Sequence, residues 1–250
     1  MQSFQKVRLS MCGRYYVEDT ETEELRRIMA RLGIRDPGAD TPELGSDTAP
    51  AAAKTSVVQH TSDTAAPLAS DLGNTSDAAA FQPFSHRRDI VPGSPAPMIA
   101  GSSGTLLLTR CTWGYPAVDG KGRLLINARA ETALTKPTFR EDVRLRRCLL
   151  PASGFYEWNA QREKFAFTGE DGPLLLAGFY GMHGTLPRFV ILTTAANASM
   201  APVHPRMPLI LPVEDAAAWI LEDAQTAAFL EKKPALLHCE QEGQLSLNLR

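Results

Sequence analysis

Four short motifs of this 250-residue chain carry side chains that could do covalent or acid–base chemistry. They supply the thiol of Cys12 in MCGR (11–14), the amide of Asn127 in NARAET (127–132), the carboxyl of Glu157 in PASGFYEW (151–158) and the imidazole of His204 in HPRMP (204–208). A thiol becomes a nucleophile when a neighbour lowers its pKa or takes its proton. His204 is the natural partner for Cys12, because the other histidines lie in predicted loops, in a polar tract or near the end of the sequence. The motifs predict a site that combines thiol chemistry with proton transfer.

Each of these groups also has a structural interpretation, which the residues alone leave open. A free cysteine is usually a small buried hydrophobic residue, and a single histidine such as His204 is more often structural. Glu157 stands among aromatic residues, where desolvation would raise its pKa and suit it to act as a general acid, but it could equally pair with an arginine. Asn127 ends an apolar run, either as a turn residue or as a polar group that orients a ligand.

The rest of the sequence argues against several other classes of site. It contains no GxGxxG, P-loop, GxSxG or HExxH motif. Its four cysteines are scattered without a CxxC pair, which argues against disulfides and against a zinc site in a reducing compartment. No apolar run is long enough to span a membrane, and MQSFQKVRLS lacks the apolar region of a secretory signal. We expect a cytoplasmic protein that uses neither a cofactor nor a metal.

The net charge of −2 conceals two stretches of opposite charge. Residues 36–80 hold seven acidic residues and one basic residue, a net of −6, whereas residues 121–147 hold eight basic and three acidic residues, a net of +5. The basic stretch is either a solvated face or a surface that follows phosphates. The acidic stretch has no aromatic residue and cannot bury enough apolar surface to offset its ordering entropy, so we predict a disordered insertion.

Short strands are the main elements that must position the motifs. Apolar spacing predicts one helix over residues 21–33 and a second over 213–231. Short apolar or alternating runs predict strands at 106–114, 123–130, 147–158, 164–169, 173–181 and 188–196. We therefore predict an α+β fold, a single β-rich domain with a mainly antiparallel sheet or barrel and a few helices. The domain is expected over residues 11–235, interrupted by the insertion, with an N-terminal extension at 1–10 and a C-terminal tail at 236–250.

The four motifs, in this order, resemble the SOS-response-associated peptidase (SRAP) family, whose members shield abasic sites in DNA. The resemblance covers residues 11–35 and about 85–235. It implies a β-rich α+β fold and covalent capture of abasic sites in single-stranded DNA. It also implies that Cys12 corresponds to the family's cysteine directly after the initiator methionine, and that Asn127, Glu157 and His204 are its active-site residues.

The same resemblance places three arginines, Arg14, Arg129 and Arg206, near the DNA backbone. Trp113 could stack on a base, as could Tyr15, Phe155 or Tyr156, although aromatic residues in strands more often belong to the core. The partner expected is therefore single-stranded DNA with abasic sites, bound by a monomer without a membrane or a metal.

An N-terminal cysteine has the groups that such a capture needs. An α-amino group has a pKa of roughly 7.7–8.0, so much of it is neutral at cellular pH and can form an imine with the open-chain sugar aldehyde. The thiol of the same residue can then close a five-membered thiazolidine ring. Since an amide nitrogen cannot form an imine, Cys12 must become N-terminal. Either translation starts at Met11, which we favour, or the protein cleaves its own Met11–Cys12 bond as a thiol peptidase.

Two departures from the family pattern affect DNA binding. Asp89 stands where members usually carry an asparagine, which would repel phosphates unless Arg87 or Arg88 neutralises it. The loop 117–123 lacks the tryptophan that members often have there. Two alternative functions remain at this point: a thiol peptidase that acts on other proteins, and a non-covalent single-stranded nucleic-acid-binding module.

Overall fold

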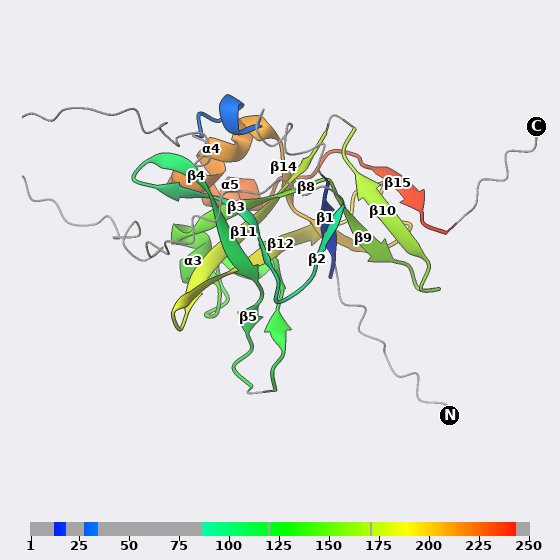
Figure 1. Ribbon diagram of the computed structural model, residues 1–250, viewed down its shortest axis with the longest axis horizontal. Coiled ribbons are helices and arrows are strands. Elements are labelled where there is room, and N and C mark those ends of the chain that lie inside the picture. The colour runs from blue at the N-terminus through cyan, green and yellow to red at the C-terminus, as the bar shows by residue number, and fades with distance from the viewer. Residues whose placement is uncertain (1–12, 19–27, 35–86, 120, 171, 244–250) are drawn as a thin grey trace, which may run out of the picture.

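The computed structural model describes residues 13–18, 28–34, 87–119, 121–170 and 172–243 (Figure 1). Cys12, the extension 1–10 and the predicted insertion at 36–80 lie outside the described residues. The described strands are β1 (Tyr15–Val17), β2 (Arg88–Ile90), β3 (Pro95–Ser102), β4 (Thr105–Trp113), β5 (Tyr115–Pro116), β6 (Leu124–Leu125), β7 (Asn127–Arg129), β8 (Arg147–Ala152), β9 (Gly154–Trp158), β10 (Lys164–Thr168), β11 (Leu174–His183), β12 (Leu186–Ala195), β13 (Arg206–Pro208), β14 (Ile210–Leu211) and β15 (His238–Gln241). The helices are α2 (Ala130–Ala133), α3 (Arg140–Leu145), α4 (Ala216–Leu221) and α5 (Thr226–Leu230), with 3-10 turns at Val213–Asp215 and Asp223–Gln225.

Five of these strands close into a barrel. The ring runs β12–β4–β3–β8–β11 and returns to β12. The β12–β4 pairing is parallel and the other four pairings are antiparallel. Three short strands extend the ring: β7 and β13 lie on opposite edges of β12 beyond its barrel pairings, and β14 pairs with β11. The predicted β-rich α+β fold is confirmed.

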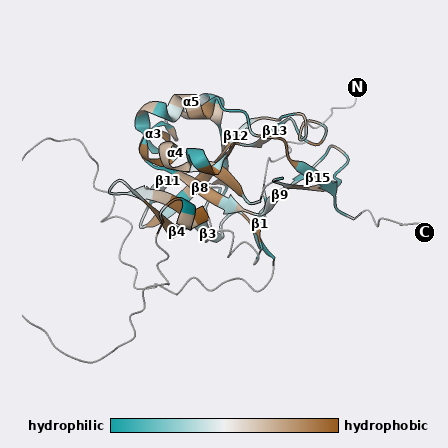
Figure 2. Ribbon diagram, turned by 90° about the horizontal axis from the view of Figure 1, so that it is seen from above, coloured by the Kyte–Doolittle hydropathy of each residue, from teal (hydrophilic) through white to brown (hydrophobic). Residues whose placement is uncertain are grey.

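A second, antiparallel sheet stands beside the barrel, in the order β15–β10–β9–β1–β2. Figure 2 shows β1, β9 and β15 at one end of the barrel strands and the helices α3, α4 and α5 over another face. The domain therefore includes β15, whose preceding residue Leu237 is buried in the core. The segment 236–250, predicted as a C-terminal tail, thus contains Leu237 and β15.

Alternation along the barrel strands divides the core in two, because successive side chains of a strand point to opposite faces. In β11, Leu175, Ala177 and Phe179 join the cluster under the helices, whereas Leu176 and Tyr180 join the cluster that faces the second sheet. Both faces of the barrel strands are thus buried. This explains why they appear in the sequence as nearly continuous apolar runs.

The predicted strand over 147–158 is two strands in different sheets. β8 belongs to the barrel and β9 to the second sheet, and the chain crosses between them at Ser153. The crossing is fixed to β1, because the Ser153 amide donates to the carbonyl of Tyr16 (2.9 Å) and its hydroxyl accepts from the amide of Glu18 (2.7 Å). Gly154 is required here, since a Cβ atom would lie 2.5 Å from the carbonyl oxygen of Phe167.

The predicted helix over 213–231 is also broken, at Glu222, whose backbone is extended. A continuing helix would use the carbonyls of Trp219 and Ile220 as acceptors for amides four residues later. Instead the buried side chain of Arg147 takes both, with Nε 2.6 Å from the Trp219 oxygen and Nη2 3.2 Å from the Ile220 oxygen. Its Nη2 also binds Asp223 at 2.5 Å, so the helix ends where this arginine inserts.

The strand predicted over 123–130 is two short strands, β6 and β7, and the helix α2 begins at Ala130. The other predictions of local structure hold where the chain is described. Residues 28–31 are helical and Gly33 has a φ of 66°, as expected for a helix stop, whereas residues 21–27 of that predicted helix lie outside the described residues. The predicted strands at 106–114, 164–169, 173–181 and 188–196 correspond to β4, β10, β11 and β12. β3 was not predicted, because Pro95 and Pro97 are unusual in a strand. Both prolines precede Ile99 and Ala100, the two residues at which β3 pairs with β8.

Candidate functional site

Glu157 is a buried carboxylate on β9, 2% exposed, opposite Phe165 of β10. The other edge of β9 pairs with β1, the strand that follows MCGR. Tyr15 lies opposite Phe155. One residue further along, the amide of Tyr156 donates to the carbonyl of Arg14 at 3.0 Å. The chain that leads back toward residue 12 therefore runs beside the strand that holds Glu157.

Asn127 is the first residue of β7 and lies opposite Ile191 of β12. The residue before it is held by Trp113, whose indole N–H donates to the carbonyl of Ile126 at 2.9 Å. The same indole packs against Tyr15, with ring centroids 5.4 Å apart, and stacks on Phe189. Trp113 thus joins the strand after MCGR to the strand that begins with Asn127.

This position corrects the expected role of Trp113. Its side chain is 0% exposed, so its ring has no face on which a DNA base can stack. The alternatives Tyr15, Phe155 and Tyr156 are buried as well. Trp113, Tyr15 and Phe155 belong to the core between the barrel and the second sheet and position the motifs from within, whereas the ring of Tyr156 packs against Tyr16 with Arg87 and Lys164 over it.

His204 is buried, 4% exposed, in the turn that leads into β13. Its amide donates to the carbonyl of Met200 at 3.0 Å. Its ring nitrogen Nδ1 lies 3.1 Å from both the amide nitrogen and the carbonyl oxygen of Arg206. Among the described residues, the hydrogen bonds of the ring are made through Nδ1, which leaves Nε2 for another partner.

The guanidinium of Arg206 binds inside the protein. Its Nη1 lies 2.5 Å from one carboxylate oxygen of Glu131 and its Nη2 lies 2.9 Å from the other, a bidentate pair. Nη2 also donates to the carbonyl of Thr193 at 2.6 Å. The hydrogen bond from Arg206 holds the pKa of Glu131 below its usual value. NARAET and HPRMP are therefore locked together across β12.

Glu131 was not singled out from the sequence, although it lies inside a quoted motif. A signal for it exists, because it is one of three acids in the strongly basic stretch 121–147. An acid among so many basic residues is a candidate for an ion pair, and here its partner is Arg206. Sequence spacing could not supply that partner, because 75 residues separate the two.

Of the other two arginines expected near DNA, Arg14 pairs with Asp89 and Arg129 is exposed. The Arg14 Nη1 and the Asp89 carboxylate are 3.1 Å apart, and both side chains are partly exposed. Arg14 thus neutralises the unusual aspartate, a task expected of Arg87 or Arg88. Arg87 instead lies over the ring of Tyr16, 3.7 Å from its centroid. Within the described ranges Arg129 forms no ion pair and remains available for a phosphate.

Comparison with known proteins agrees with this arrangement. The family model for SOS response associated peptidase (SRAP) matches residues 11–245. The chain belongs to this family.

Two curated relatives share part of their length with this family member. It is 32% identical over 146 residues to the abasic site processing protein YoqW of Bacillus subtilis, covering 53% of this chain and 65% of the relative. It is 28% identical over 149 residues to the abasic site processing protein YedK of Escherichia coli, covering 55% of this chain and 65% of the relative. The chain thus spans about 65% of the length of these relatives.

Solved structures share the fold of this SRAP member. A phage-related protein from Bordetella bronchiseptica has a TM-score of 0.56 at 26% identity, covering 64% of this chain and 84% of that one. A protein from Bacteroides thetaiotaomicron has a TM-score of 0.53 at 24% identity, covering 61% of this chain and 76% of that one, which shows the fold alone.

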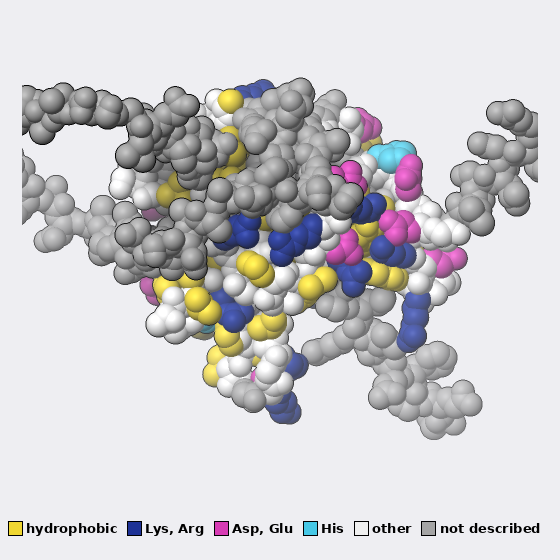
Figure 3. All heavy atoms as spheres, in the orientation of Figure 1, with side chains coloured by type: hydrophobic (Ala, Val, Ile, Leu, Met, Phe, Trp, Pro, Cys, Tyr) yellow, Lys and Arg dark blue, Asp and Glu magenta, His cyan; other side chains and the backbone are white. Residues whose placement is uncertain are grey.

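The basic stretch 121–147 is divided among several environments in this SRAP member. Arg147 is buried, Arg146 pairs with Asp142, and Arg123 pairs with Asp119. One interpretation of the sequence required a continuous phosphate-binding surface over this stretch. The stretch does not form such a surface. In Figure 3, Lys and Arg side chains lie over the middle of the molecule and along the hairpin that contains β5, whereas they alternate with Asp and Glu over β9, β10 and β15.

Three of the four cysteines of this SRAP member are described, and none offers an activated thiol. Burial raises the pKa of Cys111 to about 12 and raises that of Cys148 well above its usual value. Cys239 is exposed, but desolvation raises its pKa too. Among the described residues no group of three or more His, Cys, Asp or Glu side chains is arranged to hold a metal, and no helix is long and apolar enough to cross a membrane.

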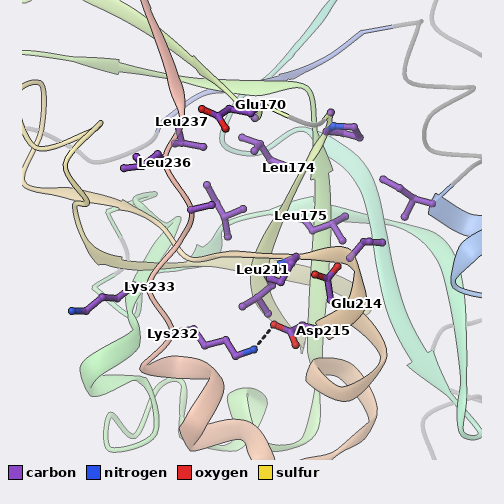
Figure 4. Close-up of a pocket in the computed structure, with 18 of the residues that line it drawn as sticks. Glu170, Leu174, Leu175, Leu211, Glu214, Asp215, Lys232, Lys233, Leu236 and Leu237 are labelled. Atoms are coloured by element: carbon purple, nitrogen blue, oxygen red, sulfur yellow. Dashed lines mark hydrogen bonds and ion pairs between the residues drawn. The ribbon is translucent and has the colours of Figure 1, made fainter.

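One groove of the described structure lies away from the motifs. It has a volume of about 760 Å³ and is bordered by β11, β14 and the segment after α5. Figure 4 shows Leu174, Leu175 and Leu211 along it, with the ion pair between Lys232 and Asp215 at its rim. None of the predicted site residues lines it. This groove therefore does not coincide with the candidate site of this family member.

Proposed function

We propose that the protein binds single-stranded DNA and captures abasic sites covalently through Cys12, and that this protects the sites during the DNA damage response. Membership of the SRAP family and the names of its abasic-site-processing relatives support this function. One structural observation carries it furthest, namely the pairing of β1 with β9. Continued by two residues, the register that pairs Tyr15 with Phe155 brings Gly13 opposite Glu157.

Cys12 is bonded to Gly13, so its Cα atom lies about 3.8 Å from that of Gly13. Its amine and thiol would thus start one residue from a buried carboxylate. By elimination it is also the cysteine best suited to react, because burial raises the pKa of Cys111 and Cys148 and desolvation raises that of Cys239.

The reaction proceeds in two steps. The neutral amine of Cys12 adds to the aldehyde carbon of the opened sugar, and water leaves to give an imine. The thiol then adds across the C=N bond, with sulfur bonding to carbon and the proton passing to nitrogen, which closes a thiazolidine ring. Only an N-terminal cysteine presents both groups in this geometry.

The buried polar residues divide the proton transfers between them. Glu157 moves protons during sugar opening and imine formation, because a carboxyl group in this position can act in both directions. His204 exchanges a proton with the sugar oxygen through Nε2, and Asn127 orients the amine or the sugar. Arg14 and Arg129 contact phosphates, which sets the position of the strand without reading its sequence.

The amine of Cys12 must be exposed before this chemistry can begin. We propose that translation from Met11 followed by methionine removal supplies it. Self-cleavage of the Met11–Cys12 bond is the other route, and it would make the protein a thiol autopeptidase.

A denaturing gel tests the proposal. Protein whose chain begins at Cys12 is incubated with single-stranded DNA that carries one abasic site. We expect a shifted band that is lost in Cys12→Ala and retained in Cys239→Ala, which removes an exposed thiol elsewhere. Cleavage of unrelated peptides without a shifted band would instead indicate a protein peptidase. Salt-sensitive binding alone would indicate a non-covalent module, and either result would overturn the proposal.

A further inference from the structure

Arg206 is held by its side chain on one side and contacts His204 through its main chain on the other. The guanidinium has four acceptors: the two carboxylate oxygens of Glu131 and the carbonyl of Thr193 at 2.5 to 2.9 Å, and the hydroxyl of Thr193 at 3.3 Å. The side chain of Arg206 is only 16% exposed, whereas that of Glu131 is 48% exposed. The pair therefore fastens the start of β13 to the NARAET segment at a partly shielded position.

The main chain of Arg206 offers Nδ1 of His204 both a donor and an acceptor. The amide nitrogen and the carbonyl oxygen each lie 3.1 Å from Nδ1. When Nδ1 carries no proton, it accepts from the Arg206 N–H, and when it is protonated, it donates to the Arg206 carbonyl. Nδ1 thus has a partner in either state, and the ring can gain or lose a proton without turning.

We propose that Glu131 is a positioning residue: by holding the Arg206 guanidinium against β12, it keeps the Arg206 main chain beside Nδ1 and fixes the orientation of the His204 ring. The pair with Glu131 thus gives Arg206 a role within the protein in addition to the phosphate contact that the family resemblance implies. The consequence for capture rests on the proposed function. The consequence for the ring itself does not, because it concerns the protein without DNA.

Nitrogen NMR of the His204 ring in the DNA-free protein tests the positioning role. The variant is Glu131→Gln, which removes the charge while it keeps the size and shape of the side chain. We expect one sharp set of ring signals throughout a pH titration of the parent protein. In the variant we expect broadened or doubled signals and a changed balance of tautomers. Glu141→Gln is the matched control, because it removes the same charge from an ion pair elsewhere, between Glu141 of α3 and Arg146.

The rate of covalent capture supplies the second readout. Glu131→Gln is expected to slow capture about tenfold, a part of what proton transfer contributes, with binding to intact single-stranded DNA within about twofold of the parent. Glu131→Asp keeps the charge and should recover part of the loss. A thermal melt shows that each variant is folded.

The outcomes separate this proposal from the proposed function. If the His204 signals of Glu131→Gln match those of the parent in number, width and titration, the positioning role is wrong. If the signals change but neither protein captures abasic DNA, the positioning role stands and the proposed function fails. If capture slows only together with DNA binding, Glu131 acts on binding and the positioning role is again overturned.

Discussion

Two regions of the molecule each contain an arginine that joins distant segments. One is the helical layer of α3, α4 and α5, and the other, here called the motif edge, is the part of β12 flanked by β7 and β13. Arg147 is buried, and it binds the carbonyls of Trp219 and Ile220 in α4, the carbonyls of Val143 and Arg144 in α3, and the carboxylate of Asp223. Arg206 makes a similar set of contacts, with Glu131 and Thr193. The chemistry of the two locks is alike, a guanidinium shared between a carboxylate and main-chain carbonyls.

The two regions differ in whether a group able to transfer protons lies beside the arginine. The contacts of Arg147 end in the backbone of two helices and one exposed carboxylate. Beside Arg206 stands His204, whose Nε2 makes no hydrogen bond to the described part of the chain. An ion pair of a buried arginine is thus no sign of function by itself. The motif edge is distinguished by the adjacent His204, whose ring nitrogen Nε2 makes no hydrogen bond to the described residues.

The strongest way to sharpen the comparison is to remove the structural lock. Arg147→Ala leaves buried carbonyls without a partner, and we expect it to lower the free energy of unfolding by about 3 kcal/mol. Chemical denaturation measures the change, and the neighbouring Arg146→Ala, whose side chain is partly exposed, should cost about 1 kcal/mol. Capture per folded molecule should stay unchanged in both. If Arg147→Ala folds as stably as the parent, the account of the helix break is wrong.

The candidate site should respond in the opposite way when Glu157 on β9 is changed in Glu157→Gln. An amide cannot transfer the proton, so we expect capture to slow about 100-fold, while DNA binding stays close to that of the parent. Single-turnover gels with excess protein measure the rate. Glu163→Gln lies in the same β9–β10 hairpin, where its carboxylate binds Asn159, and should leave the rate unaltered. Equal rates in parent and Glu157→Gln would remove Glu157 from the mechanism.

A smaller effect is expected from Arg129, the exposed arginine of the motif edge. Arg129→Gln should weaken DNA binding and reduce the slope of log affinity against log salt by about 0.7, the share of one phosphate of a single strand. Fluorescence anisotropy over a range of salt concentrations gives this slope. Lys233→Gln, in the groove away from the motifs, is the control. An unchanged slope in Arg129→Gln would show that this side chain does not contact a phosphate.

The smallest effect concerns the pH dependence of the Glu131–Arg206 pair. Because the folded-state pKa of Glu131 lies below its ordinary value of 4.5, its contribution to stability is present above that value and is lost as the pH falls further. The melting temperature of the parent should exceed that of Glu131→Gln at neutral pH, and the difference should disappear in acid. A difference that persists unchanged at low pH would mean that the charge of Glu131 is not what stabilises the pair.

Local patterns in the sequence predict a strand well where both of its faces are buried. The apolar runs of β11 and β12 were identified because both of their faces are buried. The breaks in 147–158 and 213–231 were missed, since both depend on residues far along the chain. The amide of Ser153 binds the carbonyl of Tyr16, and Arg147 takes the helix carbonyls.

The candidate site could be predicted as residue types but not as contacts. The sequence indicated His204 and Arg206, but it could not show that Glu131 holds the arginine. It also offered Trp113 as a platform for a DNA base, because a strand tryptophan is either a platform or a core residue. Only the packing against Tyr15 and Phe189 decides between the two.

The central claim is that Cys12 reacts as an N-terminal residue, and intact mass spectrometry tests it most directly. Protein is expressed from Met1 and, separately, from Met11, each preparation is incubated with a single-stranded abasic oligonucleotide, and any covalent product is weighed. We predict a mass equal to residues 12–250 plus the oligonucleotide minus one water, the loss expected from imine formation followed by thiol addition. A covalent product that still carries residues 1–11 would contradict the account. So would a chain that begins at Cys12 and leaves the oligonucleotide unmodified.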